Sequence, residues 1–210
     1  VLEKPIETVD VHYERILQNI SVPEFKGRVQ GNQFLDITRR GKYLIFSLEN
    51  DLELVAHLRM TGRLIFFSDH SIPLAKHTSV VFGFGSQGAL RFEDVRKFAT
   101  LDLVPKGEYQ TIKGLYTLGV EPLSDEFSLA SFRKLVQNRS AKIKGLLLDQ
   151  TKIAGIGNMY ADESLFLAQI HPEREASSLN AEEIKRLHKA IRDVLEVAIA
   201  NQGTTFRDYR

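Results

Sequence analysis

Basic residues gather in three short stretches of a chain whose formal net charge is only +1. The first two stretches are Arg39-Arg40-Gly41-Lys42 and Arg96-Lys97. The third spans residues 127–148, which contain no Asp or Glu and these basic residues: Arg133, Lys134, Arg139, Lys142 and Lys144. Clustered cations in a nearly neutral chain indicate a local site for a polyanion. Taken singly, each cluster is better explained as a solvated face.

Met60 and Phe98 are large apolar residues that stand close to arginines. Met60 lies in the segment 57–63, which joins two strand-like runs, and Phe98 follows Arg96 by two positions. Proteins that kink DNA insert apolar side chains between bases and place arginine beside them. For either residue alone, packing in the core is the simpler interpretation.

Two other places suit a phosphate group. Lys42 precedes an apolar strand, where a lysine can contact a phosphate or donate a proton near a sugar, although it is usually only solvated. The segment Gly155-Ile156-Gly157-Asn158 precedes a helix, and a helix N-terminus offers unpaired N–H groups to an anion. A tight turn between two helices explains the same glycines, so both interpretations stay open.

Composition limits the class of protein. The chain has 210 residues, of which 43% are hydrophobic and 26% charged, a balance typical of one large or two small globular domains. It has no apolar run long enough for a transmembrane helix and no apolar signal segment at Val1–Pro5. The absence of cysteine excludes disulfides, thiol catalysis and thiolate metal sites within these residues, and it fits a cytoplasmic location.

The hydrophobic pattern changes character along the chain. Up to about residue 105 it predicts short strands that form an antiparallel sandwich or barrel, at 6–11, 43–48, 52–58, 63–67, 79–84 and 90–92. From about Leu123 the apolar spacing is helical, with Ser128 and Asn180 as helix caps and Glu183 completing a capping box. We therefore expect an α+β fold, with an N-terminal antiparallel β-sandwich over residues 1–115 and an all-helical domain over residues 116–210.

Several motifs occur together and in a fixed order. In the first half they are Arg39-Arg40-Gly41-Lys42-Tyr43, His57-Leu58-Arg59-Met60-Thr61-Gly62 and Asp94-Val95-Arg96-Lys97-Phe98. In the second half they are residues 118–123, 143–150, 155–163, 171–174 and 203–205. In this combination the chain resembles bacterial formamidopyrimidine-DNA glycosylase, of the formamidopyrimidine-DNA glycosylase/endonuclease VIII family. The resemblance covers nearly the whole chain and favours the branch that acts on oxidised purines.

The resemblance implies a helix–two-turns–helix DNA-binding domain and a set of site residues. Met60, Arg96 and Phe98 would form the lesion wedge that fills the gap left by a flipped nucleotide, with Arg96 facing the orphaned base. The implied DNA-binding residues are Lys42, His57, His77, Arg139, Lys144 and Asn158. Lys42 would also be the catalytic proton donor in strand cleavage. The implied activity is that of a bifunctional DNA glycosylase and abasic-site lyase in base-excision repair.

The chain departs from the family pattern at both ends. The family begins with Pro-Glu, whereas Pro5-Ile6-Glu7 falls where we expect the first strand, so we expect the N-terminal proline nucleophile to be absent and these 210 residues alone to be inactive. The family's four-cysteine zinc finger has no counterpart here, so no metal or cofactor is expected in these residues. Zinc is expected if the parent protein has the finger. We interpret the chain as a fragment of the enzyme.

Two alternatives remain beside the enzyme. One is a catalytically inactive protein that binds lesions or abasic sites, and the other is an RNA-binding structural module. The expected partner is duplex DNA with an oxidised purine or an abasic site, with no membrane involved. The protein is expected to be a monomer in the bacterial cytoplasm, associated with the nucleoid when bound.

Overall fold

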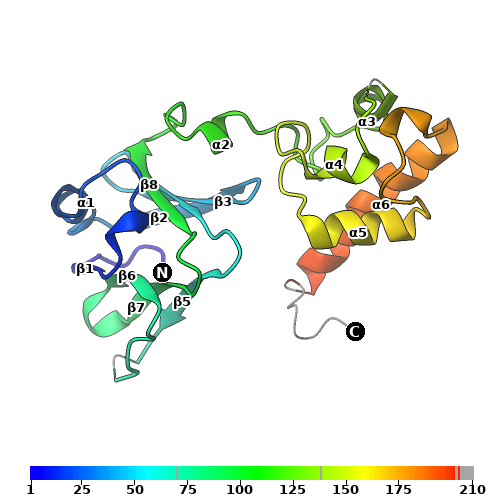
Figure 1. Cartoon of the computed structure of the whole chain (residues 1–210). Coiled ribbons are helices and arrows are strands. Elements are labelled where there is room, and N and C mark those ends of the chain that lie inside the picture. The colour runs from blue at the N-terminus through cyan, green and yellow to red at the C-terminus, as the bar shows by residue number, and fades with distance from the viewer. Residues whose placement is uncertain (70, 138, 202, 204–210) are drawn as a thin grey trace. The chain divides into compact units, whose positions relative to one another are not determined.

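Two compact units make up the chain, Val1–Tyr116 and Thr117–Arg210. The computed structural model describes residues 1–69, 71–137, 139–201 and 203. Figure 1 shows strands throughout the first unit and helices throughout the second. The change from strand-like to helical periodicity in the sequence is therefore reproduced in the structure, as is the α+β fold class.

The first unit is a sandwich of two four-stranded antiparallel sheets, which decides against a barrel. One sheet has the order β1 (Thr8–Val11), β6 (Thr78–Gly83), β7 (Ala89–Asp94) and β5 (Gly62–Phe67). The other has the order β2 (Phe34–Arg40), β3 (Tyr43–Leu48), β4 (Leu52–His57) and β8 (Thr100–Pro105). The sheets are accompanied by the short helices η1 (Glu14–Ile16), η2 (Gly85–Gln87) and α1 (Val22–Val29).

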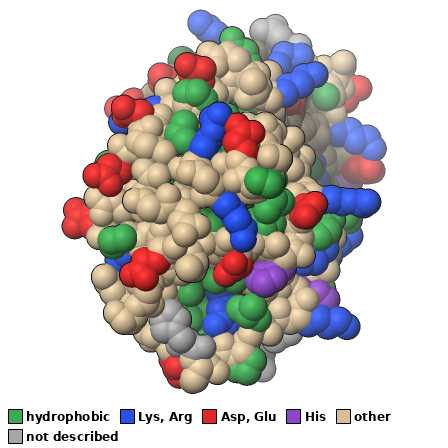
Figure 2. Space-filling model, turned by 90° about the vertical axis from the view of Figure 1, so that its left-hand side faces the viewer, with side chains coloured by type: hydrophobic (Ala, Val, Ile, Leu, Met, Phe, Trp, Pro, Cys, Tyr) green, Lys and Arg blue, Asp and Glu red, His purple; other side chains and the backbone are tan. Residues whose placement is uncertain are grey.

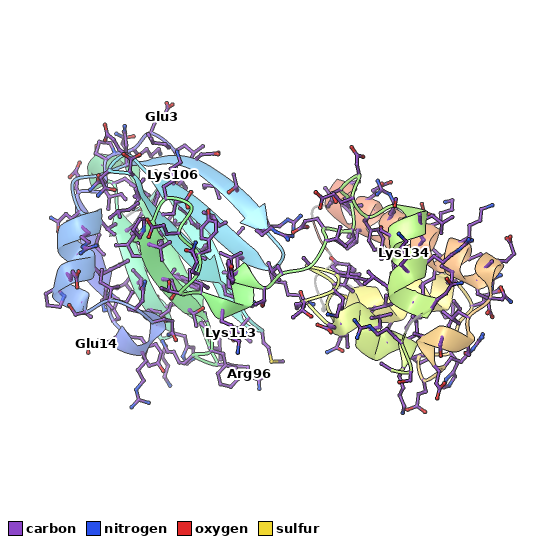
Figure 3. All side chains as sticks on the ribbon, turned by 90° about the horizontal axis from the view of Figure 1, so that it is seen from above. Glu3, Glu14, Arg96, Lys106, Lys113 and Lys134 are labelled. Carbon is purple, nitrogen blue, oxygen red and sulfur yellow. The ribbon has the colours of Figure 1, made fainter. Side chains whose placement is uncertain are left out.

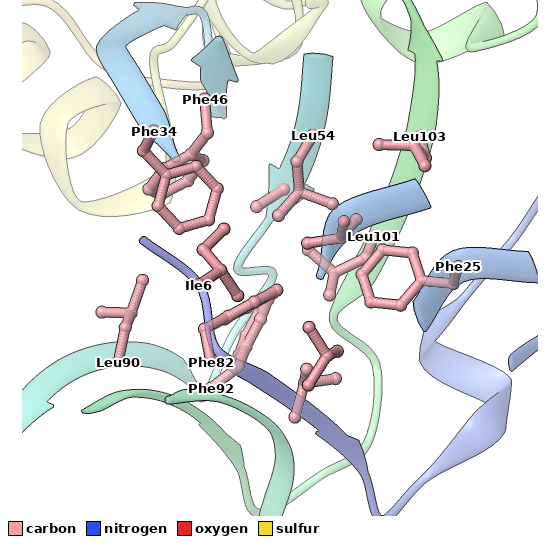
Figure 4. Packing of buried hydrophobic residues seen from close by; sticks show 14 of the residues in the cluster. Ile6, Phe25, Phe34, Phe46, Leu54, Phe82, Leu90, Phe92, Leu101 and Leu103 are labelled. Carbon is pink, nitrogen blue, oxygen red and sulfur yellow. The ribbon is translucent and has the colours of Figure 1, made fainter. Parts of the chain in front are cut away.

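Alternate residues of the strands build the core between the sheets. Val80 and Phe82 of β6 and Phe92 of β7 are almost fully buried, because every second side chain of a strand faces the same side. Phe34 packs edge-on against Phe82 at a centroid distance of 5.6 Å, and Phe25 of α1 joins the same cluster. Figure 4 shows these rings meeting between the sheets.

The strand predictions agree with the structure for most of the sandwich. Residues 43–48 form β3 as expected, and the other predicted strands differ from the observed ones by at most two residues at either end. The first strand begins at Thr8 rather than Ile6, and Pro5 forms an isolated antiparallel bridge with Gln33. No prediction was made for α1, β2 or β8. Most residues of β2 are exposed, which removes the alternating pattern that reveals a half-buried strand.

The second unit has its own hydrophobic core, formed by helices α3 (Leu129–Gln137), α4 (Ile143–Leu148), α5 (Asn158–Leu167) and α6 (Ala181–Ala200) and the short η3 (Ala176–Ser178). The predicted capping box is confirmed. Asn180 Oδ1 accepts from the N–H of Glu183 at 2.9 Å, and the Glu183 carboxylate accepts from the N–H of Asn180 at 2.9 Å. Arg174 also donates to both oxygens of Glu183, at 2.5 and 3.1 Å, which lowers the pKa of that carboxyl group.

Segment 106–112 leads from the sandwich to α2 (Lys113–Tyr116). It is held by hydrogen bonds to one buried carboxylate, that of Glu53. Glu53 of β4 accepts from the hydroxyl of Tyr109 at 2.6 Å and from the N–H of Gly107 at 3.0 Å. Burial, together with the hydrogen bond to Glu53, raises the pKa of Tyr109 to about 12. The phenol therefore remains a donor throughout the physiological range of pH.

Acidic, basic and apolar side chains are interspersed on the face of the molecule shown in Figure 2. This mixture agrees with the formal net charge of +1. Within the described residues, no helix is both long and apolar enough to cross a membrane.

We predict that Tyr109→Phe lowers the free energy of unfolding by about 2 kcal/mol, because it leaves the buried Glu53 carboxylate without its closest donor. Urea denaturation followed by circular dichroism measures the change. Tyr116→Phe is the matched control, since the Tyr116 side chain is 64% exposed. Equal stability of the two variants would contradict the anchoring role of Tyr109.

Candidate nucleic-acid interface

Met60, Arg96 and Phe98 meet on the surface of the sandwich. Met60 lies between β4 and β5 and is 71% exposed, and Phe98 lies between β7 and β8 and is 53% exposed. Packing in the core, the simpler interpretation for either residue alone, is therefore wrong, whereas the exposed position that the family resemblance implies agrees with the structure. Arg96 links them, since its guanidinium donates to the Met60 sulfur at 3.0 Å and stands 4.9 Å from the centre of the Phe98 ring. We call these three residues the apolar–arginine cluster.

The cluster points away from the interior of its unit. Figure 3 shows Arg96 projecting outward from the sandwich. Two exposed apolar side chains held beside a guanidinium can insert into an apolar gap while the arginine donates hydrogen bonds there. Among the residues that the structure describes, Met60 and Phe98 are large hydrophobic side chains that remain exposed, so the core does not cover them.

The two loops that carry the cluster have constrained backbones. Arg59 and Lys97 adopt left-handed conformations, with φ of 54° and 58°, although neither is glycine. Between the loops lies the carboxylate of Asp94, which is 1% exposed. It accepts hydrogen bonds from the Thr61 hydroxyl, the N–H of Arg96 (3.2 Å) and the N–H of Ala99 (2.8 Å). Burial opposes its ionisation, but these hydrogen bonds outweigh burial and lower the pKa of Asp94.

Sequence reasoning did not single out Asp94 or Thr61 as site residues. Both stand in the quoted motifs, yet a carboxylate and a hydroxyl more than thirty positions apart give no local signal of a contact. The pairing of Gly62 with Asp94 between β5 and β7 brings them together.

Lys42 and His57 lie at the same end of the second sheet. Tyr43 pairs with His57 across β3 and β4, and His57 pairs with Thr100 across β4 and β8, so the turn bearing Lys42 and both cluster loops share this end. The side chain of Lys42 is exposed as a whole. Neighbouring atoms nevertheless remove part of the hydration of its ammonium group, which lowers the pKa of Lys42.

His57 is buried and electrically neutral at neutral pH. Its ring stands edge-on to Tyr43 at 4.5 Å, and its Nδ1 accepts from the N–H of Arg59 at 3.0 Å. Burial, with the nearby charges of Arg59 and Lys42, lowers the pKa of His57 to about 4. Because Nδ1 is the acceptor, the proton of the neutral ring sits on Nε2, which remains a donor for an external group.

His77 joins this end of the sandwich through its backbone. It is half-buried just before β6, and its carbonyl accepts from the N–H of Asp94 at 3.0 Å and from Lys97 Nζ at 3.4 Å. The structure therefore brings six of the sequence-predicted residues to one end of the sandwich: Lys42, His57, Met60, His77, Arg96 and Phe98.

The remaining three predicted residues lie in the helical unit. Asn158 is the first residue of α5, and its N-cap is Gly157, which supplies no capping side chain. Lys144 of α4 forms an ion pair with Asp162 of α5 at 2.8 Å, so the cation stands beside the first turns of α5. Gln150 fixes the preceding turn by accepting from the N–H of Gly155 and donating to the carbonyl of Ile156, each at 2.9 Å. Arg139 is exposed beyond the end of α3.

The described residues do not fit a zinc site. No group of three or more His, Cys, Asp or Glu side chains in the described part of the chain is arranged to hold a metal ion, and the sequence contains no cysteine. Of the motif 203–205, only Gly203 lies within the described residues.

We predict that His57 makes the folded state less stable as the pH falls. Above its ordinary pKa of 6.5 the ring is neutral in both states, whereas between 6.5 and about 4 only the unfolded chain binds the proton. His57→Asn keeps an acceptor for Arg59 and should reduce the loss of unfolding free energy between about pH 7 and about pH 5. Denaturant titrations at the two pH values measure the unfolding free energy of the unmodified protein and of His57→Asn. Identical losses in the two proteins would refute the lowered pKa of His57.

Comparisons with known proteins agree on one family. The family model for the formamidopyrimidine-DNA glycosylase N-terminal domain matches residues 1–101, and the model for the H2TH domain of the same enzyme matches residues 118–210. Formamidopyrimidine-DNA glycosylase of Pelotomaculum thermopropionicum is 44% identical over 204 residues, which are 97% of this chain and 74% of the relative. That of Desulfitobacterium hafniense is 45% identical over 210 residues, all of this chain and 76% of the relative.

Solved structures give the same result. A variant of the Lactococcus lactis enzyme in complex with DNA containing Fapy-dG matches with a TM-score of 0.92 and 35% identity, over 100% of this chain and 76% of that one. The Lactococcus lactis enzyme bound non-covalently to DNA with an abasic site matches with a TM-score of 0.90 and 35% identity, over 97% of this chain and 77% of that one. This chain belongs to the formamidopyrimidine-DNA glycosylase family.

Proposed function

We propose that the protein repairs oxidised purines in duplex DNA by base excision. It flips the damaged nucleotide out of the helix, cleaves its N-glycosidic bond and cleaves the strand at the resulting abasic site. The observation that carries this proposal is the exposed apolar–arginine cluster, held by two constrained loops in a chain of this family.

Flipping explains why such a cluster is needed. A base inside a duplex is out of reach, and extruding it costs a few kcal/mol. Met60 and Phe98 fill the gap and restore apolar contact with the neighbouring bases. Arg96 carries only donors, so it suits the acceptors of a cytosine left without its partner.

Charged and polar residues at the sandwich end and in the helical unit bind the backbone. Lys42, His57 and His77 contact phosphates from the sandwich, and Arg139, Lys144 and the N-terminus of α5 at Asn158 contact them from the helical unit. His57 does so as a neutral Nε2 donor. Lys144 exchanges one anionic partner, Asp162, for another, a phosphate.

Lys42 is also the proton donor in strand cleavage. Its lowered pKa makes the ammonium a stronger acid than an ordinary lysine. The reaction class further needs a nucleophilic amine at C1′ of the sugar. Pro5 does not supply it, because its nitrogen is an amide within the chain and its backbone pairs with Gln33. We therefore expect these 210 residues alone to bind lesions without releasing the base.

We expect zinc only where a four-cysteine segment accompanies these residues in the full protein. The activity implies action on the bacterial chromosome in the cytoplasm.

Base release and strand nicking test the proposal directly. The full gene product is incubated with a duplex containing one formamidopyrimidine lesion opposite cytosine, and the free base and the nicked strand are quantified separately. We expect both products, and loss of nicking in Lys42→Met. The inactive lesion reader predicts binding without either product, and the RNA-binding module predicts preference for undamaged RNA over the lesion duplex.

We predict that Phe98→Ala and Met60→Ala weaken binding to lesion duplex about tenfold, which corresponds to ~1.4 kcal/mol, with a much smaller effect on undamaged duplex. Fluorescence anisotropy with the two duplexes measures both affinities. Phe166→Ala is the matched control, because Phe166 of α5 is 83% exposed and stands outside the site. Unchanged lesion affinity in both wedge variants would overturn the repair function.

We predict that Lys144→Ala weakens binding to both duplexes and lowers the slope of log affinity against log salt by about 1, because one phosphate contact is lost. The slope is obtained from anisotropy titrations over a range of salt concentrations. Lys185→Ala, which removes an exposed lysine of α6, is the control and should leave the slope unchanged. A slope unaltered by Lys144→Ala would exclude this phosphate contact.

A further inference from the structure

We infer that Asp94 and Thr61 are positioning residues that hold the apolar–arginine cluster in its DNA-binding arrangement before DNA arrives. This inference rests on the proposed function and names the device that prepares the cluster for it. Neither side chain is fully exposed: Asp94 is 1% exposed, and Thr61 is half-buried.

The hydrogen bonds form a clasp between the two loops. The Thr61 hydroxyl, from the loop of Met60, donates to Asp94 Oδ1 and accepts from the N–H of Arg96 at 3.1 Å. Asp94 Oδ1 also accepts from the N–H of Arg96, while Oδ2 accepts from the N–H of Ala99. Arg96, two residues before Phe98, Ala99, directly after it, and Thr61, directly after Met60, are therefore bonded to one carboxylate.

The backbone on each side makes the clasp specific. The N–H of Gly62 donates to the carbonyl of Leu58 at 3.0 Å, and a Cβ on Gly62 would collide with that carbonyl oxygen, so the hairpin closes tightly around Met60. Lys97 in its left-handed conformation turns the other loop so that Arg96 and Phe98 face each other. Such conformations persist only where surrounding contacts impose them, and the carboxylate supplies those contacts here.

The clasp matters for binding because ordering loops opposes association. Side chains and backbone that become ordered on binding each reduce the affinity, whereas a pre-ordered loop avoids this loss. Undamaged duplex, bound through its phosphates, does not require an inserted wedge. Loss of the clasp should therefore reduce affinity for a lesion selectively, whereas a purely structural role would affect both duplexes alike.

Thr61→Val and Thr61→Ser separate the hydroxyl from the shape of the side chain. We expect Thr61→Val to weaken binding about tenfold to a duplex with a tetrahydrofuran abasic-site analogue opposite cytosine, and by less than about twofold to the undamaged duplex. Thr61→Ser restores the hydroxyl and should restore lesion affinity. Asp94→Asn should lower lesion affinity at least as much, and thermal unfolding of every variant reports whether the fold is intact.

The outcomes distinguish the inference from the proposed function. If the unmodified protein does not prefer the abasic-analogue duplex, the proposed function fails, and the clasp has no role in it. If the unmodified protein has this preference and Thr61→Val and Asp94→Asn retain it, the proposed function stands and the positioning role is wrong. Equal weakening on both duplexes, or failure of Thr61→Ser to restore affinity in a folded protein, also overturns the positioning role.

Discussion

A carboxylate removed from water must have hydrogen-bond donors around it, and this constraint organises the end of the sandwich that carries the site. Asp94 closes β7 with its side chain inside the unit. Its oxygens accept hydrogen bonds from a hydroxyl in the loop between β4 and β5 and from two backbone N–H groups in the loop between β7 and β8. The loops cannot separate without leaving a buried charge unpaired, and so the exposed residues at their tips keep a fixed arrangement.

The sandwich makes this arrangement possible through strand register. Antiparallel pairing of β3, β4 and β8 places the start of β3, the end of β4 and the start of β8 at one end of their sheet. The pairing of β5, β6 and β7 likewise places the starts of β5 and β6 and the end of β7 at one end of the other sheet. Because one residue of slip would turn every core side chain outward, the buried aromatic rings fix the register. The core thus determines which loops meet, although none of the core residues belongs to the site.

Local electrostatics follow from packing more than from net charge. Lys42 and His57 have lowered pKa values because the surrounding protein removes water from them, so one is a stronger acid than usual and the other a neutral donor. In the helical unit, Lys144 and Lys142 form ion pairs with Asp162 and Glu173, at 2.8 and 2.7 Å. A nearly neutral chain can therefore offer chemically different contacts to one anionic polymer.

The sequence by itself determined the fold class, most of the strands, the capping box at Asn180 and the family. These depend on periodicity and on short motifs, which act over a few neighbouring residues. For Met60 and Phe98 taken singly, the pattern favoured the core, because a single apolar residue carries no sign of which way it faces, and only the family resemblance implied an exposed wedge. The pattern also missed β2, whose exposed residues do not alternate. Only the tertiary structure decided that Met60 and Phe98 are exposed, that Arg96 contacts both, and that Thr61 and Asp94 form a hydrogen bond between their loops. Those contacts link residues more than thirty positions apart, and only the pairing of β5 with β7 brings them within hydrogen-bonding distance.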